Sequence, residues 1–180
     1  MKHMNLPNRL TMLRILLVPF ILLCFYLPAS WGMWVAVVLC IGASVTDTVD
    51  GRYARAHNMV TDFGKFMDPI ADKLLVNSVL VMLTAQGKVH PVVTILFIAR
   101  EFVISGLRLV AAGKGVVLAA GNLGKIKTTL QDIALPFLMV GHVWKGFRIV
   151  GLVLLYASLV MSVWSGWDYV YENRELIKQE

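Results

Sequence analysis

The sequence predicts an all-α, polytopic membrane protein with six transmembrane helices, and three observations support this fold class. Hydrophobic residues make up 58% of the 180 residues, above the ~45–50% usual in soluble domains, and the mean hydropathy is +0.71. Six apolar stretches each approach the ~20 residues that a helix needs to cross a bilayer. Basic residues fall mainly in alternate connections, which is typical of a chain that crosses a membrane several times.

Each expected helix coincides with one apolar stretch between polar or turn-forming segments. The first is expected over residues 6–27, before Pro28, and the second over 31–49, with Asp47 in its last turn. The remaining four are expected over residues 68–86, 91–110, 127–143 and 147–167. An aromatic belt at the end of the sixth comprises Trp164, Trp167, Tyr169 and Tyr171. We expect one integral membrane domain over residues 1–180, with a polar cytoplasmic tail from about 172 to 180.

The net charge of +6 narrows the possible partners. An excess of basic residues suits nucleic acid, an anionic membrane face or a phosphorylated substrate. The apolar background favours the last two, and no nucleic-acid partner is expected. The positive-inside rule places both termini in the cytoplasm, because most basic residues fall on one side of the predicted topology. That side holds Arg9, Arg14, Arg52, Arg55, Lys65, Lys73, Arg108, Lys114, Lys125 and Lys127, whereas Lys88, Lys145 and Arg148 fall on the other.

Four aspartates beside or inside apolar segments predict a metal site. Asp47 and Asp50 share a face of one helix, and Asp68 and Asp72 share a face of the next, because residues three or four apart are neighbours on a helix. A carboxylate in a bilayer costs at least about 2.5 kcal/mol, so four together need compensating charge, most simply one or two divalent cations. Gly51, Ala54 and Gly64 are small and leave room on the acidic faces. The alternative is that these aspartates are solvated helix-end charges, as the helix dipole would favour for Asp68.

The spacing D-x2-D-G-x2-A-R-x8-G-x3-D-x3-D, from Asp47 to Asp72, resembles the defining motif of the CDP-alcohol phosphatidyltransferases. Further stretches resemble a bacterial branch whose acceptor is glycerol 3-phosphate, and the likeness covers about residues 5–128. These stretches are Asn5-Leu6-Pro7-Asn8 with Thr11 and Arg14, residues 62–73, Ala99-Arg100-Glu101 with Gly106-Leu107-Arg108, and Gly124-Lys125-Ile126-Lys127-Thr128.

The resemblance implies a reaction in which an alcohol displaces CMP from CDP-diacylglycerol. It implies two divalent cations, Mg²⁺ or Mn²⁺, held by Asp47, Asp50, Asp68 and Asp72, with Asp72 also acting as the general base. The residues implied for the CDP-lipid are Gly51 and Ala54 at the cytidine, Arg55 at the pyrophosphate, and Thr61 and Gly64. A homodimer in the bacterial cytoplasmic membrane, with membrane lipids around it and its active site facing the cytoplasm, is also implied.

The acceptor phosphate is expected to bind basic residues of the fourth and fifth predicted helices. By resemblance these are Arg100, Arg108, Lys125 and Lys127. Arg100 lies well inside its predicted helix, about two turns from Arg108, and a phosphate suits the forked geometry of a guanidinium. Alternatively Arg100 forms a structural ion pair, and Lys125 and Lys127 are topology charges at a helix start. Glu101 is spaced to pair with Arg108, and Lys73 is expected to be a topology or headgroup charge.

Two other functions fit parts of the sequence. One is a sister enzyme with a different acceptor: serine, inositol phosphate or phosphatidylglycerol. The other is a divalent-cation channel or transporter, which would also need intramembrane acids. A transporter needs a path from both sides, and no acidic residue falls in the outer halves of the predicted helices. The common motif does not separate the sister enzymes, but the basic residues of the fourth and fifth predicted helices favour a small phosphorylated acceptor. We therefore expect phosphatidyl transfer to glycerol 3-phosphate.

Overall fold

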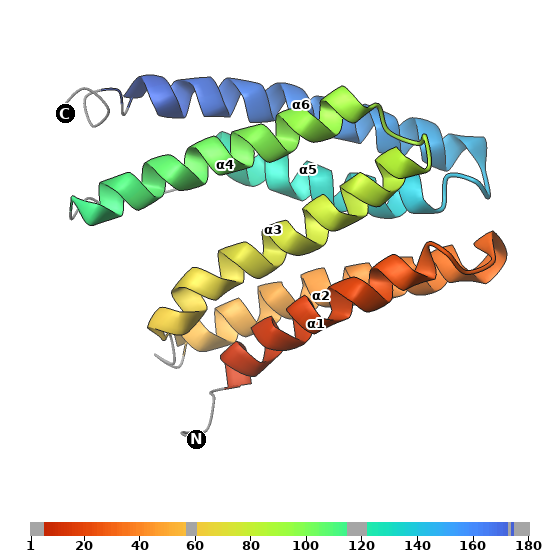
Figure 1. Cartoon of the computed structure of the whole chain (residues 1–180), viewed down its shortest axis with the longest axis horizontal. Coiled ribbons are helices and arrows are strands. Elements are labelled where there is room, and N and C mark those ends of the chain that lie inside the picture. Colours follow the sequence, from red (N-terminus) through yellow and green to blue (C-terminus); the bar gives the residue numbers. More distant parts are fainter. Residues whose placement is uncertain (1–5, 57–60, 115–121, 173, 175–180) are drawn as a thin grey trace.

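The computed structural model describes residues 6–56, 61–114, 122–172 and 174, and these form an all-α fold (Figure 1). Side chains are described for most of these residues, but not for 47–56. The helices are α1 (Leu6–Cys24), α2 (Ala29–Ala56), α3 (Asp62–Ala85), α4 (Pro91–Gly113), α5 (Asn122–Met139) and α6 (Lys145–Glu172). Each of the six predicted helices is present, whereas most of their ends differ from the prediction.

The ends differ because apolar length measures a membrane span and not a helix. Asp47 does not lie in the last turn of α2, since the helix continues for nine residues beyond it. The third helix begins at Asp62 instead of Asp68, because the Thr61 hydroxyl caps it by accepting from the Gly64 N–H at 3.0 Å. The fifth begins five residues early, so Lys125 and Lys127 both lie on it. Of the expected polar tail, most lies outside the described residues.

The helices run alternately in opposite directions, so α2, α4 and α6 end where α1, α3 and α5 begin (Figure 1). α1 packs against α2 and α3, α5 lies along α6, and α4 packs on α6. α3 lies between α1 and the group formed by α4, α5 and α6. It therefore connects the acidic motif of α2 and α3 with the basic residues of α4 and α5.

A buried apolar core holds the helices together, while the outward faces are also apolar. Ile21, Leu80 and Phe97 are fully buried in the core. On α4, Ile95, Phe102 and Leu109 are exposed at intervals of seven, which places them on one outward stripe. An exposed stripe of large apolar side chains is typical of a helix that faces lipid.

Two of the described helices are long and apolar enough to cross a membrane. They are Pro7–Cys24 within α1 and Lys145–Glu172, which is α6, and α2 contains a shorter apolar stretch at Trp31–Thr46. α3, α4 and α5 carry charges within their length, such as Asp72, Arg100 and Lys127. These are the residues that the sequence assigned to a site.

One face of α1 fixes the start of α3 and the middle of α2. Asn8, Thr11 and Arg14 are buried at intervals of three, so they lie on the same face. The Thr61 hydroxyl donates to Asn8 Oδ1 at 2.8 Å, and the Thr11 hydroxyl contacts Asp68 Oδ1. Arg14 Nε donates to the Ala43 carbonyl of α2 at 3.3 Å. Arg14, which the predicted topology placed among the cytoplasmic basic residues, is thus buried between helices.

Replacing Gly64 with Ala is expected to destabilise this contact between α1 and α3. An added Cβ would lie 3.1 Å from Asn8 Oδ1 and 3.3 Å from Thr61 Oγ1, so their hydrogen bond would have to shift. Crowding of this kind costs about 1–3 kcal/mol, which exceeds the gain of up to ~1 kcal/mol from removing a helical glycine. Thermal unfolding in detergent should show a lower Tm. Gly106→Ala is the control, because nothing lies within 4 Å of the added Cβ and its Tm should be unchanged or higher.

Candidate active site

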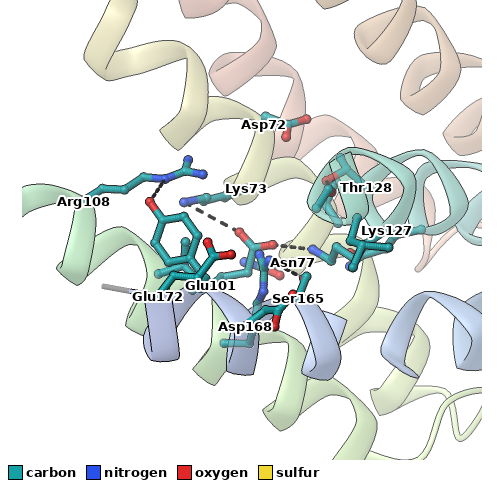
Figure 2. A pocket seen from close by; sticks show the side chains of 17 residues that line it. Asp72, Lys73, Asn77, Glu101, Arg108, Lys127, Thr128, Ser165, Asp168 and Glu172 are labelled. Carbon is teal, nitrogen blue, oxygen red and sulfur yellow. Dashed lines mark hydrogen bonds and ion pairs between the residues drawn. The ribbon is translucent and has the colours of Figure 1, made fainter. Parts of the chain in front are cut away.

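A cavity of about 300 Å³ opens where α3, α4, α5 and α6 meet, and polar side chains from all four line it (Figure 2). This volume is at the lower end of the range for small-molecule sites. The lining includes three of the predicted site residues on α4 and α5, together with Asp72 of the acidic motif. The charged lining residues are Asp72, Lys73, Arg100, Glu101, Arg108, Lys127, Asp168 and Glu172.

The acidic motif reaches the cavity through Asp72. Asp68 and Asp72 are half-buried on one face of α3, four residues apart, and Asp72 lines the cavity. The Thr11 hydroxyl from α1 contacts Asp68 Oδ1 and thereby orients that carboxylate. Gly64, on the same face, was expected to leave room for a ligand. The Asn8 side chain lies close to it, since a Cβ added to Gly64 would be 3.1 Å from Asn8 Oδ1.

The other half of the motif lies on α2. Asp47 and Asp50 are three residues apart in a continuous helix, so they share a face, as do Gly51 and Ala54. α2 contacts α3, which carries Asp68 and Asp72. The side chains of Asp47, Asp50, Ala54 and Arg55 lie outside the described set, and no group of three or more metal-binding side chains occurs within that set.

Glu101 binds two lysines inside the cavity. Its Oε1 lies 2.5 Å from Lys127 Nζ on α5, and its Oε2 lies 3.7 Å from Lys73 Nζ on α3 (Figure 2). Lys73 also donates to the Ser105 hydroxyl. The expected pairing of Glu101 with Arg108 is therefore wrong. It assumed a partner on the same helix, whereas the actual partners come from α3 and α5. Lys73, expected to be a topology charge, is a cavity residue.

The two arginines of the cavity are held by side chains of α6. Arg100 Nη2 donates to the Ser165 hydroxyl at 2.9 Å, and its buried Nε has no hydrogen-bond partner among the described residues. Arg108 Nε donates to the Tyr169 hydroxyl at 3.1 Å, and the guanidinium carbon lies 5.5 Å from the centre of the Tyr169 ring. These contacts hold both guanidinium groups at the cavity wall, where an anion could reach them.

Sequence reasoning missed the contribution of α6 to the cavity. Ser165, Asp168, Tyr169 and Glu172 all line it, although Tyr169 was assigned to an aromatic belt. Trp164, Trp167 and Tyr171 are exposed, as a belt requires, whereas Tyr169 is half-buried against Arg108. Spacing gives a signal, because Ser165, Asp168 and Glu172 follow at intervals of three and four on one helical face.

The predicted basic residues are not all in the cavity. Lys125 is exposed and does not line it, whereas Lys127 is buried and does. Thr61, expected near a nucleotide, caps α3 and donates to Asn8. The structure therefore brings together Asp72, Arg100, Arg108 and Lys127, and it gives Thr61 and Gly64 packing contacts at the start of α3.

The acidic motif lies in the part of the chain that matches a family of lipid-synthesising enzymes. Residues 4–164 match the family described as CDP-alcohol phosphatidyltransferase, and the chain belongs to this family. Members of this family use divalent metal ions and act at membranes, in keeping with the apolar helices of the present chain.

Several full-length relatives within this family share one name. The CDP-diacylglycerol–glycerol-3-phosphate 3-phosphatidyltransferase of Bacillus subtilis (strain 168) is 41% identical over a 190-residue alignment covering 97% of each chain. The enzyme of the same name from Rickettsia felis is 41% identical over 168 residues, 92% of this chain and 93% of the relative. That from Shigella flexneri serotype 5b is 39% identical over 177 residues, 94% and 95% of the two chains.

Proposed function

We propose that the protein transfers the phosphatidyl group of CDP-diacylglycerol to glycerol 3-phosphate and releases CMP. The observation that carries the proposal is that Asp72, the last residue of the acidic motif, shares one cavity with Arg100 and Arg108. A donor bound at the acidic motif and a phosphorylated acceptor bound at the arginines would then meet at Asp72. The names of the full-length relatives specify the same donor and acceptor.

In the proposed reaction, a hydroxyl oxygen of glycerol 3-phosphate attacks the phosphorus that carries the diacylglycerol. Asp72 accepts the hydroxyl proton as a new O–P bond forms, and the O–P bond to CMP breaks on the opposite side. CMP leaves with the bridging oxygen and its electron pair. Arg100 and Arg108 hold the acceptor phosphate through charge-assisted hydrogen bonds, and Lys127 adds positive charge to the wall while it remains bonded to Glu101.

The donor set of the acidic motif fits a pair of divalent cations. Mg²⁺ and Mn²⁺ prefer carboxylate oxygens, which Asp47, Asp50, Asp68 and Asp72 would supply. The contact from Thr11 to Asp68 resembles the outer contacts that orient metal ligands in proteins. Bound there, the cations would neutralise the pyrophosphate and stabilise the departing CMP. Gly51, Ala54 and Arg55 are proposed to contact the CDP group.

We also propose that all six helices cross the membrane, with the cavity at the cytoplasmic side. The charges of α3, α4 and α5 that would disfavour a span, among them Asp72, Arg100 and Lys127, line the cavity instead of facing outward. Inward-facing charges of this kind are tolerated in membrane proteins. Labelling of introduced cysteines from either side of intact vesicles tests the orientation. The homodimer stays a prediction from the family, and light scattering in detergent tests it.

Replacing Thr11 with Val is expected to raise the metal requirement. The substitution removes the hydroxyl that contacts Asp68 while keeping the shape of the side chain. Loss of such an outer contact typically lowers metal affinity about 10–100-fold. The half-saturating Mn²⁺ concentration for CMP release should rise by about tenfold or more. Thr129→Val is the control, because Thr129 is exposed and bonds only within α5. Equal metal dependence in the two variants would contradict the role of Thr11.

The decisive experiment supplies the purified protein with CDP-diacylglycerol and each acceptor in turn: glycerol 3-phosphate, serine, inositol phosphate and phosphatidylglycerol. Product is expected with glycerol 3-phosphate and with none of the other three acceptors. Product with serine but not with glycerol 3-phosphate would overturn the proposal. Mn²⁺ flux into proteoliposomes without any CMP release would indicate a cation transporter instead.

A further inference from the structure

Glu101 lies among the cations of a cavity that is proposed to receive an anion. Its carboxylate joins Lys127 of α5 to Lys73 of α3 across the cavity (Figure 2). The exposed fraction of the side chain is 2% for Lys127, 14% for Glu101 and 36% for Lys73. The most deeply buried of the three charges is therefore an ammonium, and its closest partner is this carboxylate.

A carboxylate at this place opposes phosphate binding, because like charges repel strongly in a partly buried site. The contribution of Glu101 must therefore be something other than tighter binding of phosphate. Lys127 Nζ lies 5.4 Å from the centre of the Phe97 ring, which is fully buried in the core. A phosphate drawn to an unpaired Lys127 would move toward this inner wall. Arg100 and Arg108 are held separately by Ser165 and Tyr169, so they do not depend on Glu101 for their contacts.

We propose that Glu101 is a positioning residue that fixes Lys73 and Lys127 and keeps their charge from capturing the acceptor phosphate. The phosphate is thereby left to Arg100 and Arg108, and the acceptor hydroxyl can reach Asp72. This inference rests on the proposed function. A residue that binds the phosphate directly would raise both the affinity for phosphate and the rate of turnover. Glu101 is proposed to lower the affinity for phosphate and to raise the rate of turnover.

The test measures both quantities on the full-length protein in detergent. In Glu101→Gln, inorganic phosphate should bind about tenfold or more tightly, because a nearby negative charge is gone. The kcat for CMP release with glycerol 3-phosphate should fall about tenfold or more, because a misplaced acceptor reacts slowly. Calorimetric titration gives the phosphate affinity, and steady-state kinetics give kcat. Loss of a merely structural contact would not tighten phosphate binding.

Two further variants act as matched controls. Glu101→Asp keeps the charge and shortens the side chain, so its phosphate affinity should stay within about twofold of the wild type while kcat falls less than in Glu101→Gln. Glu101→Gln combined with Lys127→Met removes the pair together and avoids an unpaired buried ammonium. Its phosphate affinity should return toward that of the wild type, and its kcat should rise above that of Glu101→Gln, because the ammonium that misplaces the acceptor is gone.

The inference is overturned if Glu101→Gln binds phosphate more weakly than the wild type or keeps a normal kcat. If that variant does not fold, Glu101→Asp and the double variant decide the matter. The inference is then overturned if Glu101→Asp keeps the wild-type kcat, or if the double variant still binds phosphate more tightly than the wild type. Failure of the proposed function is a separate result. A wild-type protein that makes no product from glycerol 3-phosphate would refute that function. The phosphate affinities of the wild type and of the Glu101 variants would still test whether Glu101 opposes phosphate binding in the cavity.

Discussion

Asp72→Asn is expected to abolish turnover while leaving CDP-diacylglycerol binding measurable. Asparagine keeps the shape of the side chain but cannot accept the hydroxyl proton, and loss of a general base typically costs about 10²–10⁴-fold in rate. The loss should lie at the upper end of this range, because Asp72 is also a proposed metal ligand at the edge of the acceptor cavity. CMP release in detergent gives kcat, and equilibrium binding of labelled CDP-diacylglycerol gives the donor affinity.

The matched control is Asp132→Asn, which alters a half-buried carboxylate on α5 that does not line the cavity. Its kcat should fall much less than that of Asp72→Asn, since its carboxylate does not line the acceptor cavity. Near-normal CMP release by Asp72→Asn would refute the proposed role of Asp72. A loss of donor binding in parallel with turnover would show that Asp72 acts in binding the CDP-lipid and not as a base.

Arg100→Met is expected to raise the KM for glycerol 3-phosphate by about 10- to 150-fold, because a hydrogen bond to a charged group contributes about 1.5–3 kcal/mol. The guanidinium lies at the cavity wall, held by Ser165, with its buried Nε without a hydrogen-bond partner among the described residues. The KM for CDP-diacylglycerol should change little, because the donor is proposed to bind at the acidic motif. Initial rates with each substrate varied in turn separate the two effects.

Two arginine variants define the specificity of that result. Arg100→Lys keeps the charge but loses the planar fork, so its KM should lie between those of the wild type and Arg100→Met. Arg148→Met removes an exposed arginine near the start of α6, away from the cavity, and should leave both KM values unchanged. Equal KM values for glycerol 3-phosphate in Arg100→Met and Arg148→Met would exclude Arg100 from the acceptor site.

Apolar length and turn residues were enough to predict the number of helices but not where they end. The helix beyond Asp47 is polar, so hydropathy gives no reason to extend it, although a helix needs no apolar residues to continue. The early start of α3 depends on the cap at Thr61 and on Asn8, which lies 53 residues earlier in the chain. Contacts over such separations are set by packing, which a single sequence does not display.

The candidate site was predictable where chemistry constrains one helix and obscure where charges pair between helices. The spacing of Asp68 and Asp72 on one face, and the placement of Arg100 inside α4, are properties of single helices. The partners of Glu101 come from α3 and α5, so counting residues along α4 led to Arg108 instead. The role of Tyr169 was ambiguous from the sequence, because an aromatic residue near the end of a span suits an aromatic belt as well as a contact with an arginine.

The buried polar face of α1 has a consequence for handling the protein. A basic start followed by an apolar helix could be mistaken for a cleavable export leader. Asn8 and Thr11 nevertheless contact Thr61 and Asp68, at the start of the helix that carries half of the acidic motif. Proteolytic removal of α1 would leave Asp68 without its threonine contact and Thr61 without its amide acceptor. Any trimming of the amino end must therefore stop short of Asn8.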